Sequence, residues 1–121
     1  MARIAITSEG PALEDMVDPR FGRAGGFVIV DTDTMQTEYV DNGGSQAMAQ
    51  GAGIQAAENV AGSGVQAVLT GIVGPKAFKA LNAAGVKIAE GFEGLTIKNA
   101  VERFKAGDFS YTDEPGGGPG R

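Results

Sequence analysis

The run GFVIVD, residues 26–31, is apolar at every position from Phe27 to Val30. Successive side chains of a strand point to opposite faces of a sheet, so a continuously apolar strand has to be covered on both faces. The segment VQAVLTG, residues 65–71, has the same character and predicts a second buried strand. These two segments therefore constrain the chain to a sheet that lies between two other layers.

The rest of the chain alternates between strand patterns and helix patterns. Residues 27–42 read as a β-hairpin, because two strand-like runs flank the turn residues TDTM. The predicted strands are residues 3–7, 26–31, 36–41, 65–71 and 86–90, and the predicted helices are residues 52–61, 74–85 and 95–107. We therefore expect an α/β fold, a three-layer domain with a mixed five-stranded sheet and helices on both faces.

Apolar residues at helical spacing predict which face of each helix is buried. These residues are Ile54, Ala57, Val60 and Ala61 in the first helix, Ala77, Phe78 and Leu81 in the second, and Ile97, Ala100, Val101 and Phe104 in the third. Pro75 suits a first helical turn, and Gly85 suits the end of a helix. A length of 121 residues is typical of one domain, which we place at residues 1–108. Residues 109–121 have no periodicity and many glycines and prolines, so we predict a disordered tail.

The net charge of −5 and the isoelectric point near 4.6 describe an acidic protein. Non-specific binding to nucleic acid or to an anionic membrane needs a basic surface, so neither partner is expected. No run approaches the roughly 20 apolar residues of a membrane span, and the amino terminus has no signal-peptide pattern. The sequence therefore predicts a cytoplasmic protein.

The chain contains neither cysteine nor histidine. Zinc, iron–sulfur clusters and haem are normally held by thiolate or imidazole ligands, so no directly ligated metal is expected. Nucleophilic catalysis by a histidine-activated residue is excluded as well, and no catalytic residue is proposed. The cluster of Asp31, Asp33 and Asp41 is typical of turns, where aspartate bonds to nearby backbone.

Two glycine-containing loops lead into predicted helices, at residues 49–58 and 70–78. A helix N-terminus presents unpaired N–H groups and a positive dipole end, so each loop is a candidate anion site. The letters of residues 51–56 match G-x-G-x-x-A, but a long loop separates them from the preceding strand, which argues against dinucleotide binding. The second loop has Ala77 after Lys76 and therefore lacks a Walker motif.

The stretch VDPRFGRAGGFVIV, residues 17–30, sets Arg20 and Arg23 around Phe21-Gly22. A solvated turn explains this pattern as well as an anion site does. For each glycine loop, tight packing is likewise an alternative to ligand binding.

Four linked motifs carry a resemblance to a known family. They are DPRFGRAGGFVIVDTDT at 18–34, GAGIQAAENV at 51–60, AVLTGIVGPKAFKAL at 67–81 and GVKIAEG at 85–91. In this order and spacing they resemble the dinitrogenase iron–molybdenum cofactor biosynthesis family. The resemblance implies a ribonuclease-H-like fold and a protein that binds metal–sulfur cofactors and is not an enzyme. The small cysteine-free members to which the chain is most similar hold a molybdenum–copper sulfide cluster non-covalently.

The resemblance implies that the inorganic cluster brings its own sulfides and needs no thiolate from the protein. We place it where the bend at residues 20–26 meets the loops at 42–53 and 71–76. Arginine hydrogen bonds, backbone N–H groups and an apolar wall from Phe21, Met48 and Ile72 would hold it. The predicted cofactor-binding residues are Arg20, Phe21, Gly22, Arg23, Asn42, Met48, Gly51, Ala52, Gly53, Gly71, Ile72, Gly74 and Lys76. A small-anion or nucleotide-binding module, and an enzyme of unknown chemistry, are the alternatives.

Overall fold

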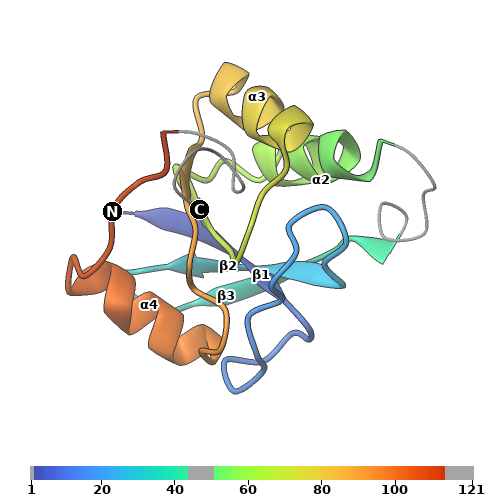
Figure 1. The fold of residues 1–121 in the computed structure, drawn as a ribbon. Helices are drawn as coiled ribbons and strands as arrows, with labels where there is room; N and C mark the ends of the chain where they lie inside the picture. Colours follow the sequence, from blue (N-terminus) through green and yellow to red (C-terminus); the bar gives the residue numbers. More distant parts are fainter. Residues whose placement is uncertain (1, 44–50, 114–121) are drawn as a thin grey trace.

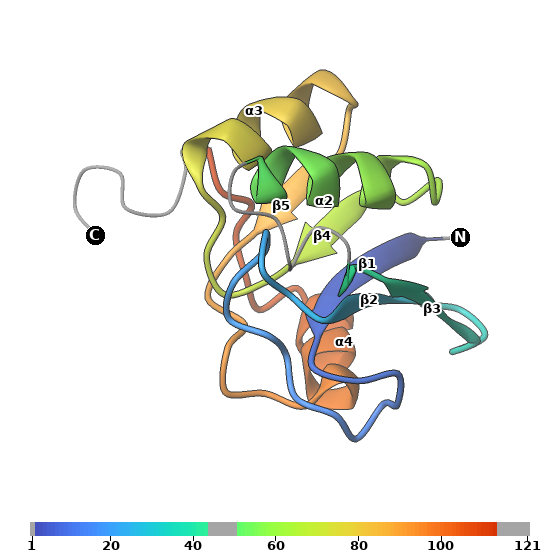
Figure 2. The same ribbon diagram turned by 90° about the vertical axis from the view of Figure 1, so that its right-hand side faces the viewer.

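A computed structural model describes residues 2–43 and 51–113 of the chain. A five-stranded sheet forms the middle layer, with helices α2 and α3 on one face and helix α4 on the other (Figure 1, Figure 2). The strands are β1 (Arg3–Ser8), β2 (Gly26–Asp31), β3 (Thr37–Asp41), β4 (Ala67–Leu69) and β5 (Lys87–Ala89), and the helices are α2 (Ala52–Ala61), α3 (Pro75–Ala83) and α4 (Ile97–Lys105). Within the described ranges, no helix is long and apolar enough to cross a membrane.

The sheet is mixed, as the sequence predicted. Its strand order is β3-β2-β1-β4-β5. β2 runs antiparallel to β1 and to β3, whereas β4 runs parallel to β1 and to β5. The carboxyl ends of β1, β3 and β4 therefore lie at one edge of the sheet, together with the start of β2.

Alternation along the strands divides the interior into two cores, as the continuously apolar runs required. Phe27 and Ile29 of β2 belong to the core beneath α2 and α3, whereas Val28 and Val30 belong to the core beneath α4. β1 and β4 are divided in the same way. Each central strand thus contributes to both helical layers, which fixes its register, because a shift of one residue would exchange the two cores.

The predicted buried face of α2 is only partly right. Ala57 and Val60 are buried, but Ile54 is 42% exposed, and the buried set is completed by Ala52 and Ala56. The buried face of α2 is made of three alanines and Val60, so its largest apolar side chain, Ile54, lies mostly outside that face. The predicted faces of α3 and α4 are confirmed, with Phe104 of α4 only partly buried.

The chain stays in contact with the domain after Asp108. The ring of Phe109 lies 5.1 Å from that of Phe104 and 6.1 Å from that of Phe92, measured between centroids. The backbone N–H of Thr112 donates to the carbonyl of Ile88 at 2.6 Å. Residues 114–121 of the predicted tail lie outside the described residues, so the domain boundary at residue 108 and the disorder of the tail stay predictions.

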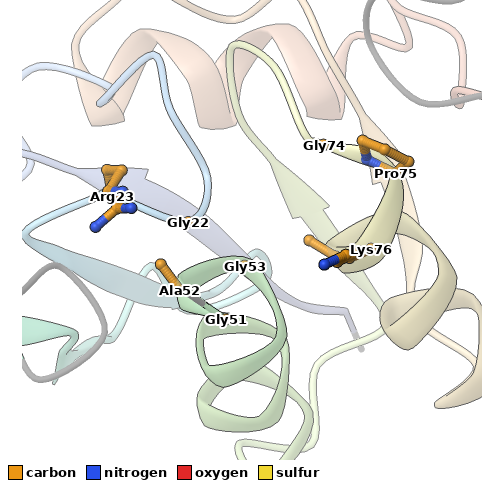
Figure 3. Close-up of a pocket in the computed structure, with 9 residues that line it drawn as sticks. Gly22, Arg23, Gly51, Ala52, Gly53, Gly74, Pro75 and Lys76 are labelled. Atoms are coloured by element: carbon orange, nitrogen blue, oxygen red, sulfur yellow. The ribbon is translucent and has the colours of Figure 1, made fainter. Parts of the chain in front are cut away.

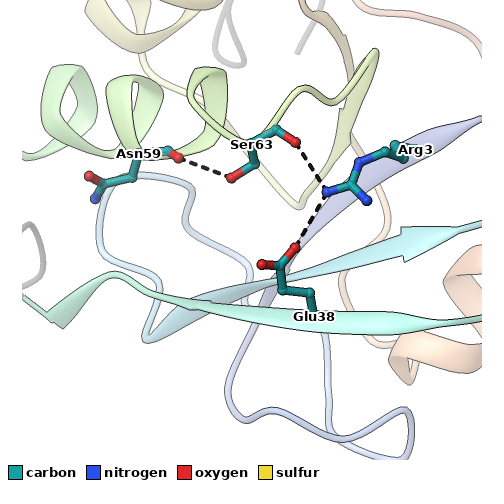
Figure 4. A network of polar contacts seen from close by, with 4 residues as sticks. All are labelled: Arg3, Glu38, Asn59 and Ser63. Atoms are coloured by element: carbon teal, nitrogen blue, oxygen red, sulfur yellow. Dashed lines mark hydrogen bonds and ion pairs between the residues drawn. The ribbon is translucent and has the colours of Figure 1, made fainter.

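Arg3 connects three parts of the chain at the amino end of β1 (Figure 4). Its guanidinium lies 3.4 Å from the carboxylate of Glu38 on β3 and donates to the carbonyl of Ser63, beyond α2, at 3.2 Å. The hydroxyl of Ser63 in turn donates to the carbonyl of Asn59. The Arg3 side chain is 41% exposed and that of Glu38 is 65% exposed, so the ion pair itself contributes at most about 1 kcal/mol.

Thr96 caps α4, and its removal tests how much that helix depends on its start. The Thr96 hydroxyl accepts a hydrogen bond from the N–H of Asn99 at 3.1 Å. Replacing it, as Thr96→Ala, should lower the free energy of unfolding by about 1 kcal/mol in urea denaturation. Thr96→Ser keeps the acceptor and should stay close to wild type, and an equal loss in both variants would contradict a capping role.

Candidate anion-binding site

A pocket of about 500 Å³ opens at the carboxyl edge of the sheet, between the bend at residues 20–26 and the starts of α2 and α3 (Figure 3). We call it the anion pocket. It is lined by Gly22, Arg23, Gly51, Ala52, Gly53, Gly74, Pro75, Lys76 and Ala77. Ligands of open α/β sheets bind at this edge, where the helices that follow the strands begin.

Helix α2 begins at the pocket without a side-chain cap. Gly51 is its N-cap residue and has a φ of 76°, a conformation that favours glycine. Gly51 itself provides no side-chain cap, and the first turn of α2 holds no acidic residue. The positive end of the helix dipole is thus not offset by a carboxylate of the same turn.

Helix α3 begins at the same pocket in the same manner. Gly74 is its N-cap residue and Pro75 occupies the first turn. Neither a side-chain cap nor an acidic first-turn residue is present among the residues described there. The first turn instead carries Lys76, whose exposed side chain lines the pocket.

Three small residues allow the bend, α2 and α3 to pack closely against one another. A Cβ atom at Gly22 would lie 3.0 Å from both N and Cα of Gly53, and a Cβ atom at Gly53 would lie 3.1 Å from that of Ala77. These distances are tighter than ordinary packing, so glycine is what lets the bend, α2 and α3 come so close. Figure 3 shows the start of α2 between the bend that carries Arg23 and the turn that carries Lys76.

The bend is fixed to the loop that follows β4. The N–H of Phe21 donates to the carbonyl of Ile72 at 3.1 Å, and the N–H of Ile72 donates to the carbonyl of Pro19 at 2.8 Å. The Asp18 carboxylate accepts from the N–H of Arg20 at 3.1 Å. The backbone of residues 19–21 and the loop that leads to α3 are therefore positioned as one unit.

Asn42 positions the other side of the bend. Its side chain is buried, donates to the carbonyl of Ala24 at 3.0 Å and accepts from the side chain of Asn59 on α2 at 2.8 Å. Asn42 therefore links the end of β3, the bend and α2, rather than lining the pocket.

The charge around the anion pocket differs from that of the whole chain. Its charged lining residues, among those described, are Arg23 and Lys76, and no carboxylate lines it. The Asp41 and Asp15 carboxylates act instead on Tyr39 of β3. Burial raises the pKa of the Tyr39 hydroxyl, and these two negative charges raise that pKa further. The pocket is thus a local positive site on an acidic protein.

Seven of the thirteen predicted site residues line this pocket. They are Gly22, Arg23, Gly51, Ala52, Gly53, Gly74 and Lys76. Of the other six, Met48 lies outside the described residues, while Arg20, Phe21, Asn42, Gly71 and Ile72 lie around the pocket and are not part of its described lining. The lining residues that the sequence analysis missed are Pro75 and Ala77, which are chain neighbours of Lys76.

The arginines and the residues expected in the apolar wall lie at different positions relative to the pocket, and their contact with a ligand stays a prediction. Of the two arginines, Arg23 lines the pocket, whereas Arg20 is exposed beyond it. Phe21 is 1% exposed and packs against Phe27, with 5.5 Å between ring centroids, so it belongs to the core. Ile72 is 48% exposed and contributes its backbone to the bend.

The donors at the pocket suit an anion and not a bare metal ion. Within residues 2–43 and 51–113, no group of three or more acidic, cysteine or histidine residues could hold a metal ion. The pocket instead offers a guanidinium, an ammonium and the backbone of two helix starts. These groups donate hydrogen bonds and attract negative charge.

The sequence matches one family, dinitrogenase iron–molybdenum cofactor, over residues 1–107. Among solved structures, the apo form of the orange protein from Desulfovibrio gigas is 57% identical, with a TM-score of 0.93, and the match covers 95% of this chain and 96% of that one. A candidate NifB protein from Thermotoga, solved by NMR, is 40% identical, with a TM-score of 0.79, over 92% of this chain and 93% of that one. Among curated proteins, none is similar enough to count as a relative.

Gly71 gives a test of how tightly the bend is packed on the loop after β4. A Cβ atom there would lie 2.5 Å from the carbonyl oxygen of Pro19, which is backbone and cannot rotate away. Gly71→Ala should therefore lower the free energy of unfolding by about 1–3 kcal/mol in urea denaturation. In the control Gly62→Ala, the new methyl group meets nothing closer than 3.7 Å and should have little effect; equal stability of the two variants would contradict this packing.

Proposed function

The chain belongs to the dinitrogenase iron–molybdenum cofactor family, and we propose that it binds a molybdenum–copper sulfide cluster non-covalently, as a carrier or store. The observation that carries this proposal is the meeting of two helix N-termini with Arg23 and Lys76 in one pocket of an acidic chain. The similarity to the orange protein supports the choice of cluster, which the sequence motifs first indicated.

The groups at the pocket fit such a cargo. A thiomolybdate–copper cluster is a polyanion that already contains its sulfide ligands, so a chain without cysteine or histidine can hold it. Backbone N–H groups and a guanidinium can donate to sulfide, and the positive helix ends offset the negative charge. A volume of about 500 Å³ lies in the usual range for a small-ligand site.

The lining residues have separable roles in this proposal. Arg23 and Lys76 supply full positive charge from opposite sides of the pocket, and the first turns of α2 and α3 supply backbone donors. Gly22 and Gly53 have no side chains, so the bend and the start of α2 lie close together. At these two positions the cargo would contact backbone instead of side chains. Arg20 braces the bend and makes no contact with the cargo.

Two further parts of the proposal follow from the family. We assign the sheet to the ribonuclease-H-like group, which its mixed order with β2 as an antiparallel strand supports. We also propose that the protein binds its cargo without transforming it. The absence of cysteine and histidine from the sequence supports this, because acid–base and nucleophilic chemistry would lack their usual residues.

Reconstitution tests the function directly. Mixing the apo-protein with tetrathiomolybdate and copper(II) should give visible absorption bands that the same two reagents do not give without the protein. Molybdenum and copper should both elute with the protein from a desalting column, as measured by elemental analysis. Metals that wash off, with bands identical to those of the protein-free mixture, would contradict the proposal.

A small-anion or nucleotide-binding module is the second candidate, because the same helix N-termini and cations suit a phosphate. A thermal-shift experiment separates the two. Stabilisation by tetrathiomolybdate with copper, and none by nucleotides or inorganic phosphate, supports the cluster. The reverse pattern would favour the module.

Charge-removing variants test the assignment of Arg23 and Lys76. Arg23→Ala removes a charge-assisted donor that contributes about 1.5–3 kcal/mol, so the affinity for the cluster should fall roughly 10- to 100-fold. Lys76→Ala should weaken binding less, because its side chain is exposed and more strongly screened by salt. Arg20→Ala is the matched control, with the same chemistry three residues away, and should retain the wild-type affinity in a metal-retention titration. Equal losses in Arg20→Ala and Arg23→Ala would contradict the geometry.

A further inference from the structure

Glu90 lies just after β5 and against the loop that leads to the anion pocket. Its carboxylate oxygen Oε2 accepts a hydrogen bond from the backbone N–H of Val73 at 2.8 Å. The two segments are also joined through backbone, because the N–H of Gly91 donates to the carbonyl of Gly71 at 3.0 Å. Glu90 is therefore held beside residues 71–73, which the sequence places immediately before α3.

Val73 occupies a decisive position in that loop. It is completely buried and immediately precedes Gly74, the N-cap residue of α3 that lines the pocket. A carboxylate that accepts the Val73 N–H fixes the plane of the Ile72–Val73 peptide group, just before the N-cap residue. Because only Gly74 separates Val73 from the first residue of α3, this bond restrains the backbone that leads into the helix.

Glu90 is in turn positioned by the C-terminal segment, which we define as residues 109–113. The backbone N–H of Glu90 donates to the Thr112 hydroxyl at 3.3 Å, and the N–H of Thr112 donates to the carbonyl of Ile88 at 2.6 Å. Phe109 attaches the same segment to the core below α4 by its contacts with Phe92 and Phe104. A chain of contacts thus runs from the C-terminal segment through Glu90 to the start of α3.

We propose that Glu90 is a positioning residue for the anion pocket, whose carboxylate orients the start of α3 and is itself kept in place by Thr112. Glu90 does not touch the cargo in this arrangement. Its effect on cluster binding rests on the proposed function, whereas its effect on the backbone at Val73 and Gly74 can be measured without any ligand.

Glu90 can affect the pocket in two ways, through its negative charge and as the hydrogen-bond acceptor of the Val73 N–H. A carboxylate next to a helix N-terminus stabilises the helix, but it also offsets part of the positive dipole that an anion would meet. Glu90→Gln keeps an oxygen acceptor for the Val73 N–H and removes the charge, whereas Glu90→Ala removes both. A positioning role therefore predicts that glutamine rescues the site and alanine does not.

Amide hydrogen exchange of the apo-protein, followed by NMR, tests the positioning. In Glu90→Ala the amides of Val73, Gly74 and Lys76 should exchange at least tenfold faster than in wild type. The amide of Val101 in α4 should keep its protection, which shows that the domain is folded. Glu90→Gln should restore slow exchange at all three positions. Unchanged exchange in Glu90→Ala, or equal acceleration in the two variants, would overturn the proposal.

Metal retention after reconstitution with tetrathiomolybdate and copper(II) is the second readout. Glu90→Ala should retain the cluster at least tenfold more weakly, and Glu90→Gln should bind it at least as tightly as wild type. If wild type retains no metal, the proposed function fails, while the exchange data still decide whether Glu90 positions the loop. If Val101 also loses protection in Glu90→Ala, Thr112→Val decides instead: faster exchange at Glu90 and Val73 supports the proposal, and unchanged exchange at both overturns it.

Discussion

The burial of β1 and β2 on both faces is the constraint on which the rest of this structure depends. Because neighbouring side chains of these strands enter different cores, a helical layer is needed above and below the sheet. Helices α2 and α3 cover the same face, and because they follow β3 and β4, which point in the same direction, both begin at the same edge. The convergence of two positive helix ends therefore follows from how the core is covered, before any ligand is considered.

A positive site on an acidic protein requires local, not global, charge. At physiological salt the field of a surface charge is screened within about 8 Å, so distant carboxylates have little effect in the pocket. What matters is that Arg23 and Lys76 line it and that the first turns of α2 and α3 hold no acidic residue in the described chain. The net charge of −5 still has a consequence, because it disfavours the large polyanions that nucleic acids and membranes present.

Sequence periodicity predicted the order of elements, since it reports directly on burial. It failed at Ile54, because the buried face of α2 is mostly alanine, and a pattern weighted toward large apolar residues gives alanine little weight. It could not separate Arg20 from Arg23, since both flank the same bend and the local pattern does not show which of the two lines the pocket. The local pattern also does not show that Phe21, which we expected in the wall of the pocket, is buried in the core. The contact of Glu90 with Val73 joins residues 17 positions apart, which no local pattern records.

Helices α2, α3 and α4 differ in how they begin, and this difference bears on function. α4 begins with Thr96, whose hydroxyl bonds to the helix backbone, whereas α2 and α3 begin with glycine and have no side-chain cap in the described residues. A glycine cap is weaker than threonine by only a few tenths of a kcal/mol, so stability alone hardly selects between them. A capping side chain at Gly51 or Gly74 would, however, occupy the N–H groups that face the pocket and fill the space beside them. The two helices that begin at the pocket thus begin with glycine, whereas α4, which begins elsewhere, has a threonine whose hydroxyl accepts from the N–H of Asn99.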